Sequence, residues 1–429
     1  MRIRFLLLGG VLYVLILVAL GTLNGDLLAL SLPLVIYLAS GIIFGPDVLQ
    51  LEIHRSLSTE RARQGDVVSV ELEIKNQGGG LENVVITDVL PDKLIVISGA
   101  AEYTTTLTPY TSTKIEYVFT APRGYYRFDE VAIRVSDHLG IFQRTAQFSA
   151  PSRLLIQPHV PQLRKVAIRP RRTRVFSGNI PARIGGSGVD FFGVRSFHPG
   201  DPMRWINWKA SARFPQSFFI NEYEQERVAD IGIILDTRSR SNIARNGDSL
   251  FELTIEAAAA FANIFLNDGN RVGLLMYGRH LDWTFPGYGK IQWERIMQSL
   301  ARAKPGESQY FEKLDHLPTK LFPANSQLVF VSPLQWDDTN MLIRLRARGY
   351  RVLVISPDSI EFETQSLSDQ EDQHLAIRIA KHERRLMFLK LRQAGLRMLD
   401  WNTDMPLINV VHAQLSRTPR QVPSIEVVT

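Results

Sequence analysis

Hydrophobic positions fall into three regions of this chain, and each region has its own period. Two apolar segments without a charged residue, 5–23 and 27–44, come first, separated by Asn24-Gly25-Asp26. At about 1.5 Å of rise per residue, each forms a helix about as long as a bilayer's hydrocarbon core is thick. We therefore expect a transmembrane helical hairpin over residues 1–46. A cleaved signal peptide is one alternative, which the second apolar span disfavours. Two buried core helices are the other alternative.

Charged residues around the hairpin predict its orientation. The turn carries Asp26 and no cation, whereas cations flank the hairpin on its outer sides at Arg2, Arg4, Arg55, Arg61 and Arg63. Because Lys and Arg accumulate on the cytoplasmic side of membrane helices, both ends are expected in the cytoplasm. The sequence thus predicts a two-helix protein of the cell membrane, with the bilayer as a partner and the soluble domains in the cytoplasm.

Segments of alternating apolar and polar residues fill the second region, 47–160. They lie at 67–75, 84–90, 114–121 and 131–136, interrupted by Gly, Pro and Asn. This spacing is typical of an all-β, immunoglobulin-like sandwich. Arg123–Phe128 and Asp137–Phe142 are expected to be turns at the sandwich edge. The segments contain no nucleophile–base arrangement, so we expect a spacer or docking module.

A linker and a dense signature block occupy 161–225. The linker has a run of cations over Arg164–Arg174. It is either a solvated segment or a contact for anionic phospholipid, since each juxtamembrane cation contributes about 1 kcal/mol near such a surface. Nucleic acid is not expected as a partner, because no readout motif accompanies the charge.

Strands alternate with helices over 226–429, which predicts a doubly wound α/β domain with a mostly parallel sheet. The apolar strand 231–235 ends at Asp236, and an alanine-rich helix at 249–266 follows, with Asp248 as its expected N-cap. Further strands are expected at 271–277, 328–332, 351–356 and 397–400, and further helices at 339–348, 372–394 and 406–415.

Two features of the later helices are expected from local chemistry. Gly349 and Gly395 follow helices at the position where glycine commonly ends them. The long helix 372–394 carries a dense run of Arg, Lys and His, which is expected to be mostly a solvated face.

The signature block, Arg195 to Arg213, combines a Pro-Gly-Asp turn with Trp205, Trp208 and four cationic side chains. It resembles the domain-of-unknown-function 58 family. The residues that carry the resemblance are Phe192, Arg195, Phe197, Pro199-Gly200-Asp201, Arg204, Ile206, Trp208, Ser211-Ala212-Arg213, Glu222, Glu226 and Asp236, with Arg123-Gly124-Tyr125 and Asp137–Phe142 upstream. The similarity covers about residues 1–360.

This resemblance implies several properties. The C-terminal domain is expected to be von Willebrand factor A-like, behind a hairpin and sandwich that are usual in the family. The expected partner is a MoxR-type AAA+ ATPase, a class thought to act in the assembly or maturation of other complexes.

Two interpretations of the signature block stay open. It is either an ion-pair and aromatic latch or a docking surface for a protein partner, and an active site is disfavoured. In the latch, Arg195, Arg204, Lys209 and Arg213 pair with Asp201, Glu222, Glu224 and Glu226, while Trp205 and Trp208 cover the apolar side. The predicted partner-binding residues are Arg195, Asp201, Arg204, Trp208, Arg213 and Glu222.

In von Willebrand A domains a divalent cation is held by Asp-x-Ser-x-Ser, a threonine and a further aspartate, which are hard oxygen ligands. Here Asp236 is in place, but the serine positions carry Arg238 and Arg240, and Ser332-Pro333 stands where the family often has Ser-Asp. Substitute ligands would be Thr284, Ser239, Ser241 or Asp337. We expect a degenerate metal-ion site in which Asp236 pairs with Arg238 or Arg240. Mg²⁺ is disfavoured, and no other cofactor is expected.

Composition and motifs narrow the possible chemistry further. The 429 residues carry a net charge of +6 and include no cysteine, which excludes disulfides and thiol nucleophiles. No HExxH, P-loop or nucleophile-elbow pattern occurs, and Gly185–Gly188 is expected to be a hinge.

The sequence therefore predicts a membrane-anchored, non-enzymatic adaptor that partners a MoxR-type AAA+ ATPase. The alternative is a cell-envelope adhesion or matrix-binding protein with an outward-facing soluble part. An enzyme of unrecognised type would require a polar pocket among Asp190, Asp201 and Glu222.

Overall fold

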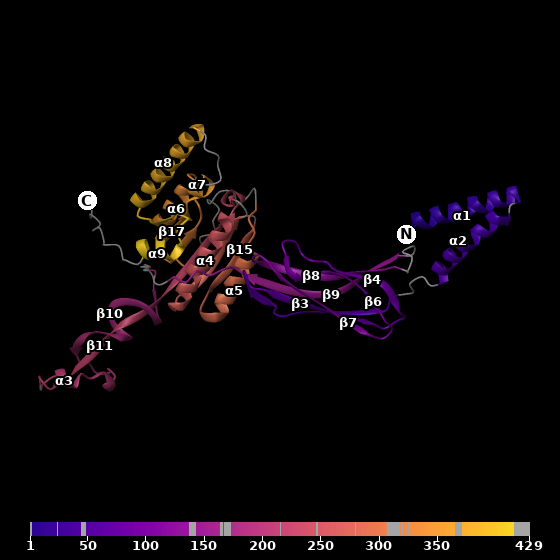
Figure 1. The fold of residues 1–429 in the computed structure, drawn as a ribbon. Coiled ribbons are helices and arrows are strands. Elements are labelled where there is room, and N and C mark those ends of the chain that lie inside the picture. The colour runs from indigo at the N-terminus through magenta and orange to yellow at the C-terminus, as the bar shows by residue number, and fades with distance from the viewer. Residues whose placement is uncertain are drawn as a thin grey trace. The chain divides into compact units, whose positions relative to one another are not determined.

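The chain has more than one domain (Figure 1). The computed structural model describes residues 2–23, 25–43, 49–136, 143–163, 166, 173–214, 216–245, 248–278, 280–306, 318, 321–324, 326–364 and 371–415. These residues form two compact units, Met1–Gln157 and Pro158–Thr429. The predicted end of the sandwich at residue 160 lies close to this division.

Two apolar helices, α1 (Arg2–Thr22) and α2 (Gly25–Ile43), begin the first unit and pack against each other. Ala19, Ser31 and Leu38 are buried in the pair. Among the described residues, the helix with the length and hydropathy of a membrane span is instead α4 (Leu250–Asn267), and 72% of it is buried within the protein. The helical hairpin is therefore present, and its insertion in a membrane remains a prediction.

Two sheets pack face to face in the rest of the first unit and share one core, so the predicted sandwich is present. One sheet has the order β1-β3-β7-β5, with β1 (Leu51–Leu57), β3 (Val68–Asn76), β5 (Ile95–Gly99) and β7 (Ser112–Thr120). The other has the order β2-β9-β8-β4-β6, with β2 (Arg61–Arg63), β4 (Leu81–Asp88), β6 (Glu102–Leu107), β8 (Gly124–Ser136) and β9 (Gln143–Gln157).

A buried ion pair joins the two sheets, because Arg55 lies on β1 and Asp88 ends β4. Tyr117 donates a hydrogen bond to Asp88 at 2.6 Å, and burial raises the pKa of this tyrosine. The prediction of topology counted Arg55 among the flanking cations. Its burial removes it from that set and leaves Arg61 and Arg63 exposed on this side of the hairpin.

The expected turn at Arg123–Phe128 is wrong. Strand β8 begins at Gly124, and Tyr126 and Phe128 alternate into the sandwich core. Aromatic residues at every second position are a strand signal that the neighbouring Gly obscured. The other expected turn, Asp137–Phe142, lies outside the described residues.

The second unit is a mixed α/β domain with the strand order β15-β14-β11-β16-β17-β18. Strands β14, β11, β16, β17 and β18 are parallel, and β15 is antiparallel to β14 at one edge. Their bounds are β11 (Phe219–Thr237), β14 (Arg271–Gly278), β15 (Leu281–Gly287), β16 (Gln327–Val331), β17 (Arg351–Pro357) and β18 (Arg397–Trp401).

Helices cover both faces of this sheet. Successive strand residues point to opposite faces, and both faces carry apolar side chains that pack against helices. Ile233 packs in the core with α4, α5 (Gly289–Arg302) and α9 (Leu407–Leu415). Ile234 packs in the other core, with α6 (Asp338–Ala347) and α8 (Glu371–Gln393). A short helix, α7 (Ser359–Thr364), contacts α8.

Strand β11 begins well before the part that pairs with the parallel strands of the sheet. Its first half pairs with β10 (Thr173–Ser196) in an antiparallel hairpin, which we call the arm. The signature block connects these strands through η1 (Met203–Trp205) and α3 (Trp208–Ser211). The predicted domain boundary at 225/226 therefore falls inside one strand. The expected hinge at Gly185–Gly188 lies within β10, where the pairing register shifts.

Local signals near the helix ends have mixed outcomes. Gly349 and Gly395 have φ of 95° and 82°, which confirms both as helix-ending glycines. The predicted cap Asp248 is wrong: the Ser249 side chain accepts from Phe251 N and caps α4. Asp248 instead pairs across a short bridge between β12 (Ala244–Arg245) and β13 (Asp248–Ser249).

Candidate functional site

The carboxyl end of β11 lies at the point where the order of the sheet reverses. From β11 the chain passes through α4 to β14 on one side, whereas β16 lies on the other side and leads through α6 to β17. In open α/β sheets such a point leaves a crevice between two loops, where ligands bind. Asp236 lies near the end of β11, and the two loops line a pocket with Arg238, Arg240, Ser332, Gln335 and Asp338.

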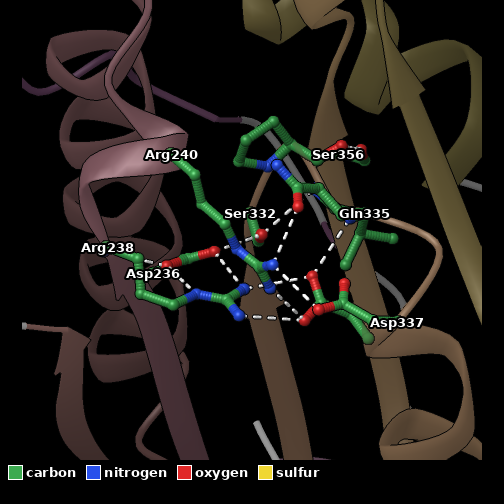
Figure 2. A network of polar contacts seen from close by, with 10 residues as sticks. Asp236, Arg238, Arg240, Ser332, Gln335, Asp337 and Ser356 are labelled. Carbon is green, nitrogen blue, oxygen red and sulfur yellow. Dashed lines mark hydrogen bonds and ion pairs between the residues drawn. The ribbon is translucent and has the colours of Figure 1, made fainter. Parts of the chain in front are cut away.

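The side chain of Arg238 lies between two carboxylates (Figure 2). Its Nε and Nη2 donate to the Asp236 oxygens at 2.8 and 2.6 Å. Nη1 and Nη2 also donate to the two Asp338 oxygens, both at 3.0 Å. All three side chains are almost fully buried. Of the two arginines expected to pair with Asp236, Arg238 is the one that does.

The loop after β16 supplies a further hydrogen bond to the carboxylate of Asp236. Ser332 Oγ donates to Asp236 Oδ2 at 2.7 Å and accepts from Leu334 N at 3.1 Å. Leu334 has φ of 58°, an uncommon conformation for a leucine. This turn also lets Gln335 N donate to Asp338 Oδ2 at 3.0 Å. The same loop therefore donates one hydrogen bond to each carboxylate, from Ser332 to Asp236 and from Gln335 to Asp338.

Arg240 forms the outer part of the network. It donates to Asp338 at 2.7 Å, to Asp337 at 2.9 Å and to Gln335 at 2.8 Å (Figure 2). Its side chain and that of Asp337 are partly exposed, unlike the inner pair. The network therefore extends from a buried core to the surface.

The charges of the network follow from burial and pairing. Burial opposes ionisation of Asp236, but hydrogen bonds from Arg238 and Ser332 hold its pKa below the ordinary value. Burial raises the pKa of Asp338 although both arginines oppose that shift. The pKa of Arg238 is also raised, because the two carboxylates outweigh burial. Arg238 therefore stays charged in the interior.

These residues do not fit a divalent cation. Mg²⁺ needs free, hard oxygen ligands, and the guanidinium of Arg238 uses both oxygens of Asp236 and of Asp338. The candidate Thr284 lies on edge strand β15, two strands from β11 in the sheet order, and its hydroxyl bonds Ser299. Asp337, another proposed substitute, is paired with Arg240.

A further buried arginine near this edge was missed. Arg384 of α8 donates to Pro333 O at 3.1 Å, to Ser356 O at 3.1 Å and to Asp400 at 2.8 Å. It thereby joins the carboxyl ends of β16, β17 and β18. The sequence placed it on a solvated face, and its position beside the apolar Met387 and Phe388 was the available signal.

Within the signature block, the structure brings three of the predicted residues together. Arg195 forms a bidentate ion pair with Asp201 at 2.7 and 2.8 Å, and its Nε lies 3.5 Å from Glu222. His198 N also donates to Asp201, at 2.8 Å. The Arg195 hydrogen bond and the His198 N–H lower the pKa of Asp201 to about 2. Asn207 caps α3 and bonds Asn221 of β11.

Other predicted members of the block form no ion pair with the side chains that the structure describes. Arg204 lies over the ring of Trp205, at 5.9 Å from its centroid. Lys209 and Arg213 form no ion pair with any side chain that the structure describes. Trp208 is exposed, so it does not cover the hairpin as expected. The side chains of Asp190, Glu224 and Glu226, and most of Arg164–Arg174, lie outside the description.

Comparison with known proteins supports one family. The family model described as "Protein of unknown function DUF58" matches residues 193–391, which include the signature block, the Asp236 network and most of α8. "Uncharacterized protein YeaD" of Bacillus subtilis (strain 168) is 25% identical over 278 residues, which is 63% of this chain and 67% of that protein. Both findings support assignment of the chain to the DUF58 family, as the signature residues indicated.

Solved structures are similar to parts of the chain at low scores. The CARDB domain of a Pyrococcus furiosus protein, in complex with di-metal ions, matches with a TM-score of 0.18 and 13% identity, over 25% of this chain and 88% of that one. The cupredoxin domain of amoB from Nitrosocaldus yellowstonii matches with a TM-score of 0.21 and 11% identity, over 29% of this chain and 98% of that one. At these scores the likenesses carry no argument about function.

Proposed function

We propose that this protein is a non-enzymatic adaptor, anchored in the cell membrane by α1 and α2, that binds a MoxR-type AAA+ ATPase through the end of the arm. In this role it assists the assembly or maturation of other complexes. The observation that carries the proposal is a cluster of exposed apolar side chains at the arm end: Met203, Trp208, Phe214 and Phe218.

The chemistry of this cluster suits a protein partner. Met203 is 77% exposed and Trp208 is 67% exposed, although both are large apolar residues. Trp208 packs edge-on against Phe218, with 6.4 Å between the ring centroids. Exposed aromatic and Met side chains gathered in one place mark interaction surfaces and often carry most of the binding energy.

The ion pairs of the block support this surface. Arg195 links Asp201 to Glu222 of β11, and this linkage fixes the turn that precedes η1. A surface that is rigid before binding loses less entropy when the partner arrives. The latch and the docking surface expected from the sequence are therefore proposed to be different residues of one block, with Arg195 and Asp201 as support and Trp208 as contact.

The filled pocket at the sheet edge supports a non-enzymatic role. Arg238 occupies the oxygens of both buried carboxylates, so neither is available as a ligand or base. We also propose that the α/β unit is von Willebrand A-like. The parallel sheet, with Asp236 at the end of a central strand, supports this assignment.

Exposed apolar side chains support membrane anchoring. Leu7, Val11 and Leu17 of α1, and Leu30 and Ile36 of α2, are each more than half exposed. Contiguous apolar surface of this kind needs a cover, and lipid supplies it. A contact of Arg164–Arg174 with anionic phospholipid, and a cytoplasmic position of the soluble units, remain part of the proposal.

Affinity purification of the full chain from native membranes tests the partner. We expect a MoxR-type ATPase to co-purify with the wild type and with Tyr110→Ser, an exposed aromatic control in the sandwich. Trp208→Ser combined with Phe218→Ser should abolish co-purification. Recovery of the ATPase with that double variant would remove the site assignment.

A reporter fused after Thr429 tests the topology. Activity on the cytoplasmic side is expected. Activity only on the exported side would contradict the adaptor and would favour the adhesion or matrix-binding alternative.

A further inference from the structure

Helix α8 has two apolar faces, and the described residues cover one of them. Its inner face packs in the second core of the α/β unit through Arg384, Met387, Phe388 and Leu391. Its outer face carries Leu375, Ile379, Leu386 and Leu389, which are 45–59% exposed. The sequence-based expectation of a solvated charged helix therefore holds for only part of this surface.

The outer apolar residues have the spacing of a coiled-coil seam. Together with His382 they fall at 375, 379, 382, 386 and 389, so the intervals alternate between four and three. We call this set the α8 seam. Residues at these intervals form one narrow stripe on a helix, and such a stripe packs against the stripe of a second helix. The seam spans two heptads, which suits docking of one helix onto a folded surface.

Charge along the seam is asymmetric. Arg378, Arg385 and Arg392 follow one side at seven-residue intervals, and none pairs with a carboxylate among the side chains that the structure describes. Glu383 and Lys390 follow the other side. Residues at these flanking positions select the partner helix by charge, so this row of arginines favours carboxylates.

A tryptophan extends the seam at its C-terminal end. Trp336 is 53% exposed, and Lys390 lies 5.4 Å from its ring centroid. Trp336 belongs to the loop that also supplies Gln335 and Asp337 to the Asp236 network. Trp is the residue type most enriched where binding energy concentrates.

We propose that the α8 seam binds an amphipathic helix of a partner protein whose apolar stripe is flanked by Asp or Glu. A second copy of α8 is disfavoured, because antiparallel pairing would oppose two rows of arginine. A membrane surface is disfavoured, because the seam is a narrow stripe, whereas an interfacial helix buries a whole apolar face at the boundary of headgroups and acyl chains. This surface is separate in sequence from the arm end, so the proposal does not depend on the ATPase.

Binding of designed peptides to the purified full chain in detergent tests the proposal. One labelled peptide has about three heptads with Leu at a and d and Glu at e and g, and its counterpart has Lys at e and g. By fluorescence anisotropy, the Glu peptide should bind at least about tenfold more tightly than the Lys peptide. Equal binding of both peptides, or binding of neither, would overturn the proposal.

Variants locate the binding and reverse its charge preference. The double variant Ile379→Ser/Leu386→Ser should bind the Glu peptide about tenfold more weakly than the wild type does. The control Ile291→Ser, on an exposed face of α5, should bind it as tightly as the wild type. Replacing Arg378, Arg385 and Arg392 together by Glu should reverse the preference to the Lys peptide, a gain that unfolding cannot produce. The matched control Arg295→Glu should leave the preference unchanged.

Two further measurements separate the other occupants. Sedimentation of the wild type and of Leu386→Ser compares self-association, and a dimer lost only in the variant would show that a second copy covers the seam. Hydrogen exchange of α8 in the detergent-solubilised full chain, with and without added phosphatidylglycerol, would show a membrane contact if the lipid protected α8 in the wild type and not in Ile379→Ser/Leu386→Ser. Either result contradicts the proposal.

Discussion

The guanidinium of Arg238 and the carboxylate of Asp236 form a buried ion pair across only two positions of the chain. Asp236 lies near the end of the central strand β11, and Arg238 turns back to lie over it. Asp338 lies on the other side of the same guanidinium, at the start of α6, a hundred residues further along the chain. One cationic side chain thus fixes two loops at the ligand-facing edge of the sheet.

Removal of the Arg238 guanidinium should lower the stability of the α/β unit. Arg238→Ala leaves two buried carboxylates without their main partner, and breaking a buried pair typically costs about 3–5 kcal/mol. Hydrogen exchange of β11 and β16 peptides should show the loss. Arg240→Ala is the matched control and should cost less, because its side chain is partly exposed and Asp338 keeps Arg238. Similar protection in the wild type and Arg238→Ala would refute this role.

The same arginine should exclude cations. Arg238→Ser with Arg240→Ser creates Asp-x-Ser-x-Ser after β11 and frees the oxygens of Asp236. Titration calorimetry should then detect Mg²⁺ binding to the variant and none to the wild type. A clear heat of binding with the wild type would contradict the filled-site interpretation.

The outcome at this edge shows what sequence could and could not predict. The apolar run that ends at Asp236 located the edge, and two arginines at ligand positions predicted an ion pair in place of a metal. The role of Asp338 was not predicted, because it lies six residues beyond Ser332 and reaches Arg238 only through the turn at Leu334. Contacts between distant loops depend on backbone geometry that local patterns do not encode.

The fold has a similar division. Buried parallel strands and long helices give strong periodic signals, so most of the α/β unit was predicted within a few residues. The domain boundary at 225/226 was placed inside β11, because Glu222 to Arg227 interrupt the apolar pattern of this strand with charges. Arg55 was assigned to the membrane flank because charge patterns do not reveal burial, which here depends on Asp88 in another strand.

Acid should loosen the turn of the signature block. The pKa of Asp201 is about 2 in the fold, below its ordinary value of 3.8, because Arg195 and the His198 N–H stabilise its anion. A depressed pKa stabilises the fold above the unfolded value, so this contribution should disappear as the pH falls from about 4 to 2. Pepsin cleavage within 197–219 should accelerate over this range.

Asp201→Asn is the control for that experiment, because it cannot ionise. This variant should be cleaved readily both at about pH 4 and at about pH 2. The cleavage rates are normalised to pepsin's activity on an unstructured peptide at each pH. A wild-type cleavage rate that does not change relative to Asp201→Asn would argue against the ion pair.

A rise in pH through neutrality should weaken the packing of α4. Burial, with the nearby Glu252, raises the pKa of Glu256 to about 7. A raised carboxyl pKa stabilises the fold at low pH, and that contribution is lost as the pH rises from about 4.5 through 7. Glu256→Gln should therefore stabilise the α/β unit at pH 8 by about 1–2 kcal/mol after solvent screening.

Thermal unfolding between pH 5 and 8 measures this effect. The difference between Glu256→Gln and the wild type should grow with pH across that range. A difference that is constant with pH would mean that Glu256 does not titrate in the fold as described.

The central claim is that the arm end recognises a partner by its exposed apolar surface. Surface-immobilised full chain can be titrated with the purified MoxR-type ATPase that co-purifies with it. The account predicts saturable binding to the wild type and at least a hundredfold weaker binding, about 2.7 kcal/mol, to Trp208→Ser/Phe218→Ser. Equal affinity for the wild type and this double variant would contradict it.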